Sequence, residues 1–271
     1  MKRCFIQNLG LIVTNQCNLD CAHCLRGEKN SEVMSNEVID GCFGHLTSVG
    51  NLAICGGEPT LALDRIEKIF DTIVQQHIVL DTFSITINGT IYSPELLRIL
   101  DEVAKYIGGD NLPVLLDISI DKYHLDEVSR LGIREEFIDN LKRYRHNKYF
   151  SHFRDLQPKI FREGNAEHLD SKFTVPLRPM DLFVTYIGKN KKYNRDDGIC
   201  NIGPMMAVNP QGTITECDAS IKHQDEFYHY GNVFDDSFEE IALKRGILLE
   251  RPKQFIRKTH HAVSYYQTYH K

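Results

Sequence analysis

Three cysteines stand close together near the start of the chain, at Cys17, Cys21 and Cys24. Their spacing, C-x3-C-x2-C, lets three thiolates from one short loop surround a compact iron–sulfur cluster. Such clusters are usually held by four cysteines, so three ligands would leave one iron open to another molecule. The same spacing would also suit a zinc site with His23 as the fourth ligand, or a set of unpaired structural thiols.

The elements that must position this loop follow an alternating pattern. Apolar runs of strand length are expected at residues 9–14, 52–55, 82–87, 114–120, 159–161 and 182–187. Helical patterns are expected at residues 35–49, 63–76, 94–106 and within 125–146. Ser35 and Ser93 are the expected N-caps of the first and third of these helices.

This alternation predicts an α/β fold with a parallel sheet covered by helices. The length favours a partial (β/α)6 barrel of the TIM type over eight repeats, followed by a small module of a β-hairpin and a helix. Loops at the carboxyl ends of such strands commonly carry active sites. The cysteine loop, which follows the first strand, is therefore expected there.

A resemblance to the radical SAM (S-adenosylmethionine) superfamily rests on four ordered segments. The cysteine loop resembles the signature C-x3-C-x-Φ-C, with His23 in the usually aromatic Φ position. Residues 55–59, Cys-Gly-Gly-Glu-Pro, are similar to the GGEP motif after the second strand. Residues 84–90 are similar to the third-strand TNG segment, and residues 118–121 to the fourth-strand SLD segment.

The resemblance implies a [4Fe–4S] cluster on Cys17, Cys21 and Cys24, with SAM bound to the open iron. One electron from the reduced cluster would break a carbon–sulfur bond of SAM and give methionine and a 5′-deoxyadenosyl radical. That radical would take a hydrogen atom from the substrate. An electron donor such as flavodoxin or ferredoxin is implied as a partner. No catalytic base or hydrogen donor is assigned.

The residues that the resemblance assigns to SAM binding are Gly56, Gly57, Glu58, Asn88, Ser119 and Arg130. Each could instead have a purely structural role. A tight turn accounts for the glycines and leaves Glu58 exposed, and an Asn-Gly turn accounts for Asn88. Ser119 could be a satisfied core hydroxyl, and Arg130 a solvated arginine on a helix.

Two further positions near the fourth and fifth strands carry open alternatives. Asp121 could contact SAM or substrate, but capping of the next helix explains it at least as well. Residues 162–166 resemble the GRA segment of the superfamily, with Asn165 in place of the arginine. A contact to SAM at that position is therefore in doubt.

Cys200, Gly212 and Cys217 form the pattern C-x11-G-x4-C around a hairpin expected between residues 205–209 and 213–217. The pattern resembles the opening half of the SPASM/twitch motif of peptide-modifying members. No cysteine follows Cys217 in the sequence, so we expect a cluster-free remnant or a partially ligated cluster. Cys42 is expected to be a small buried residue within a helix, and Cys55 to pack at the end of its strand.

The expected domains are residues 1–187 for the barrel, 188–250 for the SPASM/twitch-like module and 251–271 for a basic tail. The tail contains no acidic residue and interleaves basic residues with tyrosines. It could receive an acidic or phosphate-bearing substrate, although a packed or solvated tail explains it better.

Charge and hydropathy limit the classes of function. The net charge of -5 argues against general nucleic-acid binding, and no apolar run is long enough for a membrane span. The eight cysteines, without a signal peptide, predict a cytoplasmic protein rather than a disulfide scaffold. The leading substrate class is a peptide or protein side chain. The alternatives are a small molecule or nucleotide and, from another class, a non-catalytic zinc module.

Overall fold

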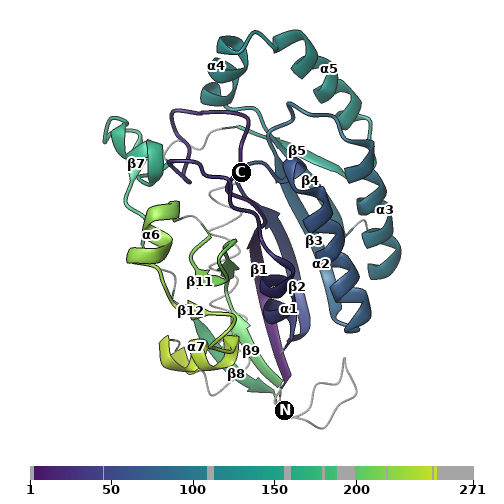
Figure 1. Cartoon of the computed structure of the whole chain (residues 1–271), viewed down its shortest axis with the longest axis vertical. Helices are drawn as coiled ribbons and strands as arrows, with labels where there is room; N and C mark the ends of the chain where they lie inside the picture. Colours follow the sequence, from purple (N-terminus) through teal and green to yellow (C-terminus); the bar gives the residue numbers. More distant parts are fainter. Residues whose placement is uncertain are drawn as a thin grey trace.

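A computed structural model describes residues 3–44, 46–108, 113–155, 160–178, 181–187, 199–217, 219–245 and 247–248. Its centre is a sheet in which five parallel strands follow one another in chain order (Figure 1). These strands are β1 (Arg3–Ile12), β2 (Leu46–Cys55), β3 (Val79–Ile87), β4 (Val114–Ser119) and β5 (Phe150–Arg154). The arrangement confirms the predicted α/β fold with a parallel sheet.

Helices connect these strands in the manner of a (β/α) barrel. They are α1 (Asn36–Phe43), α2 (Leu63–Gln75), α3 (Pro94–Ile107), α4 (Lys122–Arg130) and α5 (Arg134–Arg145). The Ser35 and Ser93 hydroxyls accept hydrogen bonds from the backbone N–H groups of Val38 and Leu96, as expected for N-caps. Gly132, with φ +71°, separates α4 from α5, so the single helix expected within 125–146 is two helices.

The first helix is shorter than the sequence pattern predicted. It ends at Phe43, and residues 46–49 belong to β2 rather than to the helix. Leu46 and Val49 are both buried in the main core from within this strand. An apolar pair three residues apart suits a helix face rather than a regular strand. Both residues reach the core here because the register with β1 shifts between Leu46 and Ser48.

The sheet has two faces of different character. Ile54, Phe83 and Ile85 point into the main hydrophobic core, which they share with buried residues of α1, α2 and α3. The other face carries polar side chains along β2 and β3, where Thr82 Oγ1 and Ser84 Oγ donate hydrogen bonds to Asn51 Oδ1 at 3.1 and 3.3 Å, and a small apolar cluster around Cys55. This second face is the concave side of an open barrel.

The fifth strand and the later strands differ from the expected barrel order. The strand that pairs with β4 is β5, which the sequence pattern did not reveal because the polar Ser151 and His152 are exposed. The predicted strand at 159–161 is β6 (Ile160–Phe161), which pairs only with β7 (Thr174–Val175) in a separate small sheet. Within the described strands, the main sheet stays open beyond β5.

On its other side, β1 pairs with two strands in succession. Its first half lies parallel to β9 (Ile199–Gly203) and its second half parallel to β10 (Met206–Val208). The remaining strands are β8 (Phe183–Ile187), antiparallel to β9, with β11 (Thr213–Thr215), β12 (Gly231–Asn232) and β13 (Ile247–Leu248). The last helices are α6 (Ile221–Glu226) and α7 (Phe238–Arg245).

The predicted hairpin after residue 205 is confirmed. Strands β10 and β11 are antiparallel, and Gly212 in the turn between them has φ +82°. Because β10 also pairs with β1, the hairpin continues the same sheet as the barrel strands. The domain boundary at residue 188 therefore stays a prediction, because the described strands on both sides of it belong to one sheet.

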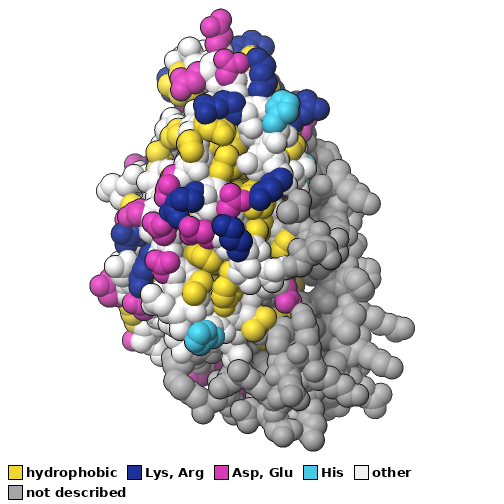
Figure 2. Space-filling model, turned by 90° about the vertical axis from the view of Figure 1, so that its right-hand side faces the viewer, with side chains coloured by type: hydrophobic (Ala, Val, Ile, Leu, Met, Phe, Trp, Pro, Cys, Tyr) yellow, Lys and Arg dark blue, Asp and Glu magenta, His cyan; other side chains and the backbone are white. Residues whose placement is uncertain are grey.

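The exterior over α2 and α3 mixes charges of both signs. Figure 2 shows acidic and basic side chains interspersed on the face that includes these helices. Arg98, for example, pairs with Glu67, Glu95 and Glu102. None of the described helices combines the length and the hydropathy that crossing a bilayer requires.

Candidate active site

The cysteine loop begins where β1 ends, and backbone hydrogen bonds fasten its start to the end of β2. Val13 N–H donates to Cys55 O at 2.9 Å. Beyond the strands, Gly57 N–H donates to Thr14 O and Glu58 N–H to Gln16 O, both at 2.7 Å. Residues 13–16, which precede Cys17, are thus held against the Gly-Gly-Glu segment by backbone hydrogen bonds.

The two glycines of this segment are required by the approach of the neighbouring backbone. A Cβ atom on Gly56 would lie 2.6 Å from Thr14 O, and one on Gly57 would lie 2.1 Å from Gln16 O. Neither position leaves room for a side chain. The sequence suggested an approach to a ligand as the reason for these glycines, and the structure adds a packing reason within the chain itself.

Glu58 is buried, and its carboxylate is engaged by the protein. Oε1 accepts hydrogen bonds from the Thr60 backbone N–H at 3.1 Å and from the Thr60 hydroxyl at 2.6 Å. Oε2 accepts from the Asn88 backbone N–H at 2.7 Å. Burial raises the pKa of Glu58 against the lowering effect of these hydrogen bonds. The side chain therefore joins the end of β2 to the end of β3.

Asn88 both shapes its own turn and reaches the cysteine loop. Its Oδ1 accepts hydrogen bonds from the Thr90 N–H at 3.0 Å and the Thr90 hydroxyl at 2.7 Å. Its Nδ2 donates to Asn18 Oδ1 at 2.8 Å and lies 3.9 Å from Cys17 Sγ. The turn predicted as an alternative is present, and the same side chain positions the residue that follows Cys17.

The three cysteines themselves fit an iron–sulfur cluster by donor type and surroundings. Leu19 N–H donates to Cys17 Sγ at 3.4 Å, and hydrogen bonds to the sulfurs are a usual feature of such clusters. Burial raises the pKa of Cys17 to about 11. Burial, together with the neighbouring Cys24 and Cys17 thiols, also raises the pKa of Cys21. A bound cationic group would hold the Cys17 and Cys21 sulfurs as thiolates.

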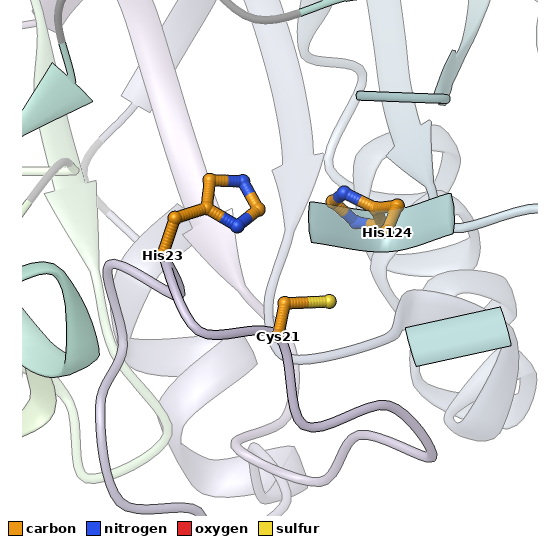
Figure 3. A group of neighbouring side chains, drawn as sticks. All are labelled: Cys21, His23 and His124. Atoms are coloured by element: carbon orange, nitrogen blue, oxygen red, sulfur yellow. The ribbon is translucent and has the colours of Figure 1, made fainter. Parts of the chain in front are cut away.

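His23, in the Φ position, belongs to a cluster with residues of α4. Its ring stacks on Tyr123 with centroids 4.8 Å apart, and its Nε2 lies 3.3 Å from Asp121 Oδ2. Figure 3 shows His23 and His124 on either side of Cys21, and one ligand atom from each of the three lies within 4.8 Å of the others. His124 was missed from the sequence, although it stands one helical turn after Asp121.

Asp121 caps α4, which confirms that alternative. Its Oδ1 accepts hydrogen bonds from the N–H groups of Tyr123 at 2.9 Å and His124 at 3.2 Å. Its Oδ2 contacts the imidazoles of His124 and His23. Burial of the carboxyl raises its pKa, but the hydrogen bonds from His124 and His23 outweigh this and hold the pKa of Asp121 well below its usual range.

Ser119 lies at the end of β4, half-buried and in register with Arg154 of β5. The Arg154 guanidinium binds the buried Asp117 carboxylate through Nε at 3.0 Å and Nη2 at 2.9 Å. His152 Nδ1 lies 3.0 Å from the same carboxylate. Asp117, His152 and Arg154 were not singled out from the sequence, because Asp117 sits in an otherwise apolar run.

Arg130 is linked to the cysteine loop through Glu127. Its guanidinium binds Glu127 in a bidentate geometry, with both N···O distances 2.7 Å, and its side chain is 64% exposed. Glu127 Oε1 accepts a hydrogen bond from Asp20 N–H at 3.0 Å. This geometry favours the solvated helix arginine over a SAM clamp, and it makes Glu127 the contact between α4 and the loop.

The 3-10 helix η2 (Gly164–His168) packs directly on the loop. Asn165 donates from its backbone N–H to Cys24 O at 2.9 Å and from Nδ2 to Cys21 O at 3.1 Å. Gly164 has φ +55°, and a Cβ there would lie 2.4 Å from the nitrogen of Gly27. The residue that replaces the arginine of the GRA segment thus holds the backbone of two of the three cysteines.

The sequence of this chain matches one known protein family. The profile described as the radical SAM superfamily matches residues 11–169, more than half of the chain. The chain belongs to the radical SAM superfamily. As a radical SAM enzyme it uses a [4Fe–4S] cluster and SAM, and its sheet is the open form of the superfamily barrel.

The curated relatives match about half of this chain. A probable GTP 3′,8-cyclase of Methanocaldococcus jannaschii is 31% identical over 143 residues, which is 51% of this chain and 45% of the relative. A probable GTP 3′,8-cyclase of Pyrococcus horikoshii is 28% identical over 142 residues, 51% of this chain and 43% of the relative. The uncharacterized protein MJ0907 of Methanocaldococcus jannaschii is 27% identical over 129 residues, 46% of this chain and 42% of the relative. The matches span less than half the length of these relatives.

Solved structures of the superfamily are similar at low identity. Native anSMEcpe with bound AdoMet and the Cp18Cys peptide has a TM-score of 0.48 and 16% identity, covering 88% of this chain and 80% of that one. Streptococcus suis SuiB bound to S-adenosylmethionine has a TM-score of 0.43 and 13% identity, covering 88% and 65%.

The C-terminal part of this radical SAM enzyme reaches the cysteine loop through Arg26. The buried guanidinium donates from Nη1 to Cys217 O at 2.6 Å and to Ala219 O at 3.0 Å. Ile221 N–H donates to Arg26 O at 3.1 Å. The segment that follows the hairpin is thus bonded to the residue two positions after Cys24.

The remaining cysteines fall in different surroundings. Cys42 is fully buried in α1, as expected. Cys217 lies beside Cys55, with the two Sγ atoms 3.7 Å apart. Cys200 pairs in register with Cys4 of β1, and its side chain, like the tail at residues 251–271, lies outside the described part of the chain.

Proposed function

We propose that this radical SAM enzyme reductively cleaves SAM and abstracts a hydrogen atom from a peptide or protein side chain, with the cluster on Cys17, Cys21 and Cys24. The observation that carries the proposal is the way one short loop with three thiols is held from several sides. The ends of β2 and β3, helix α4 and helix η2 all contact it. When bound, the cluster and SAM supply the radical chemistry, and the protein supplies the position.

Within the proposed site, the backbone of the Gly56-Gly57-Glu58 segment serves the methionyl part of SAM. The Glu58 carboxylate is committed to Thr60 and Asn88, so the recognition of an ammonium group falls to backbone carbonyls rather than to this side chain. Ser119 is proposed to bind the ribose or carboxylate of SAM. Asn88 acts by orienting the loop at Asn18.

A peptide substrate is proposed because of the C-terminal module at residues 188–250. The Cys200-x11-Gly212-x4-Cys217 pattern, which resembles the opening half of the SPASM/twitch motif, surrounds the hairpin of β10 and β11. Peptide-modifying members carry this motif, and here the hairpin adjoins β1, directly below the cysteine loop. The tail at 251–271 is proposed to be solvated.

A nucleotide is the second candidate substrate. It is favoured by relatives named probable GTP 3′,8-cyclase, whose similarity covers 51% of this chain. Because that similarity spans less than half of each relative, it supports a shared mode of SAM binding more than a shared substrate.

The proposed reaction needs a low-potential electron donor, such as a flavodoxin or a ferredoxin. It also needs the three loop thiols in reduced form, which fits the cytoplasm. A non-catalytic zinc module is set aside because the chain belongs to a superfamily of enzymes.

Anaerobic assay of the reconstituted enzyme with SAM and dithionite tests the proposal. We expect formation of 5′-deoxyadenosine, stimulated by a peptide encoded beside the gene and not by GTP. Replacement of Cys21 by Ala should abolish both cluster assembly and 5′-deoxyadenosine. Stimulation by GTP alone would move the substrate to the second candidate, and iron-free protein that binds one zinc would refute the radical reaction altogether.

A further inference from the structure

Two cysteines that are far apart in the sequence meet beside the proposed active site. Cys55 is the last residue of β2 and directly precedes Gly56, while Cys217 follows β11. Their sulfurs lie 3.7 Å apart, across 162 positions of sequence. A disulfide bond needs about 2.05 Å between sulfurs, so a shift of roughly 1.6 Å would bring them to bonding distance.

This sulfur pair lies on the concave face of the sheet. Ile54 belongs to the main core, whereas Cys55, one residue on, packs in a separate small cluster with Cys217, Met205 and Ala207. Gly10 of β1 provides the space, since a Cβ there would lie 3.3 Å from Cys217 Sγ. The two cysteines therefore belong to a small cluster that is separate from the main hydrophobic core.

The two thiols differ in access and share one cationic neighbour. Cys55 is partly exposed and Cys217 is 8% exposed. Arg26 Nη2 lies 3.6 Å from Cys55 Sγ, while Nη1 of the same guanidinium donates to Cys217 O. The guanidinium thus contacts both cysteines, Cys55 at its sulfur and Cys217 at its carbonyl. The thiolate is the form of a cysteine that attacks a disulfide.

We propose that Cys55 and Cys217 are a redox-active dithiol and that a low-molecular-weight disulfide such as oxidised glutathione closes it. The Cys55 thiolate attacks one sulfur of oxidised glutathione, which forms a mixed disulfide and releases one glutathione. The Cys217 thiolate then attacks Cys55 Sγ and releases the second glutathione. Two protein thiols are oxidised and one glutathione disulfide is reduced to two thiols, so electrons and protons balance.

The closed bond would connect the residue before the Gly-Gly-Glu segment to the segment that Arg26 holds. Both ends lie next to the cysteine loop, through Gly57 on one side and Arg26 on the other. Oxidation would therefore fasten the C-terminal part of the chain covalently to the wall of the proposed SAM site. The inference goes beyond the proposed function and does not depend on its substrate.

Peptide mapping of the reconstituted holoenzyme tests the proposal. The enzyme is equilibrated anaerobically with oxidised glutathione in tenfold excess over reduced glutathione, and the remaining thiols are alkylated. Chymotrypsin and Glu-C together cleave between Cys42 and Cys55, after Phe43, and between Cys200 and Cys217, after Glu216. We expect a cross-linked fragment pair containing Cys55 and Cys217, with Cys42 still alkylated as a thiol.

Cys55→Ser and Cys217→Ser should each abolish this cross-link while keeping the iron content of the wild type. Iron content reports whether the variants are folded, independently of any substrate. Recovery of both cysteines as alkylated thiols would overturn the proposal. So would a bond from Cys217 to Cys200 in place of Cys55, or a metal ion that blocks both thiols without a cross-link.

Discussion

At the scale of the residue, Gly57 shows how a motif position can serve the chain as well as a ligand. The position is closed by Gln16 O, which would lie 2.1 Å from a Cβ atom. Any side chain there would push residues 14–16 away and move the start of the cysteine loop. The sequence identified the glycine and its motif, but the neighbour that requires it is 41 positions away along the chain, and no local pattern shows it.

Gly57→Ala is expected to cost about 1–3 kcal/mol of folding stability, as overpacking does, and to reduce iron and sulfide after reconstitution severalfold. Gly132→Ala is the control, because φ +71° makes it strained by about 1–2 kcal/mol but no atom lies within 4 Å of its Cβ. Thermal unfolding and iron analysis measure both. Equal iron contents in the two variants would show that crowding at Gly57 does not reach the loop.

Asp121 links the loop to α4 by charge as well as by capping. Its folded pKa lies below the ordinary value of 3.8 because of the bonds to His124 and His23. The stabilisation by the ionised carboxylate is therefore complete above pH 4 and is lost as the pH falls through the folded pKa.

Asp121→Asn keeps an N-cap acceptor but removes the charge. The variant should be less stable than the wild type at pH 7, and the difference should shrink as the pH falls below 4. Urea denaturation of the metal-free protein between pH 3 and pH 7 measures this. A difference that stays constant over this range would mean that the carboxylate charge contributes nothing.

At the scale of the element, the strands and helices of the barrel follow from their apolar periods. Strands β3 and β4 and helices α2 and α3 lie where those periods place them, because each buries one clear apolar face. Strands β1 and β2 begin six residues earlier than predicted, at Arg3 and Leu46. Strand β5 could not be found this way, since it is short and partly exposed, and β6 pairs away from the barrel. Local propensity does not specify the partner of a short strand.

Helix η2 illustrates an element whose role only the fold reveals. The sequence marked Asn165 as a departure from the superfamily pattern and placed any contact there in doubt. In the fold, the same side chain bonds to Cys21 O. An asparagine can donate to a carbonyl, so the substitution replaces one kind of contact with another.

Asn165→Ala should remove that hydrogen bond at a cost of about 1 kcal/mol while leaving the backbone bond to Cys24 O intact. We expect faster release of iron to a chelator, with an unchanged circular dichroism spectrum. Asn147→Ala, which removes an acceptor for Tyr149 N–H at the end of α5, is the matched control. Identical release rates in the two variants would exclude a role for η2 in holding the loop.

At the scale of the whole molecule, the C-terminal strands β9 and β10 are part of the main sheet and pair with β1. β9 and β10 cover the free edge of β1, and residues 217–219 supply the acceptors for Arg26. A chain ending at Ile187 would expose that edge and leave a buried guanidinium without these acceptors, which is costly.

Truncation after Ile187 should therefore yield aggregated protein without iron. Truncation after Glu250 should leave iron content and SAM cleavage as in the full chain, because the described contacts of the cysteine loop come from residues before that point. Size-exclusion chromatography with iron analysis compares the two. A monomeric, iron-loaded fragment of residues 1–187 would establish the barrel as an independent domain.

The pairing of β1 with β9 and β10 also sets an order of events during synthesis. Strand β1 is made before both of these partners, and it pairs with β10 only after residue 208 has been made. Until then one edge of β1 is unpaired, next to the loop that is proposed to hold the cluster. Cluster delivery to the nascent chain is thus expected to follow the synthesis of β10.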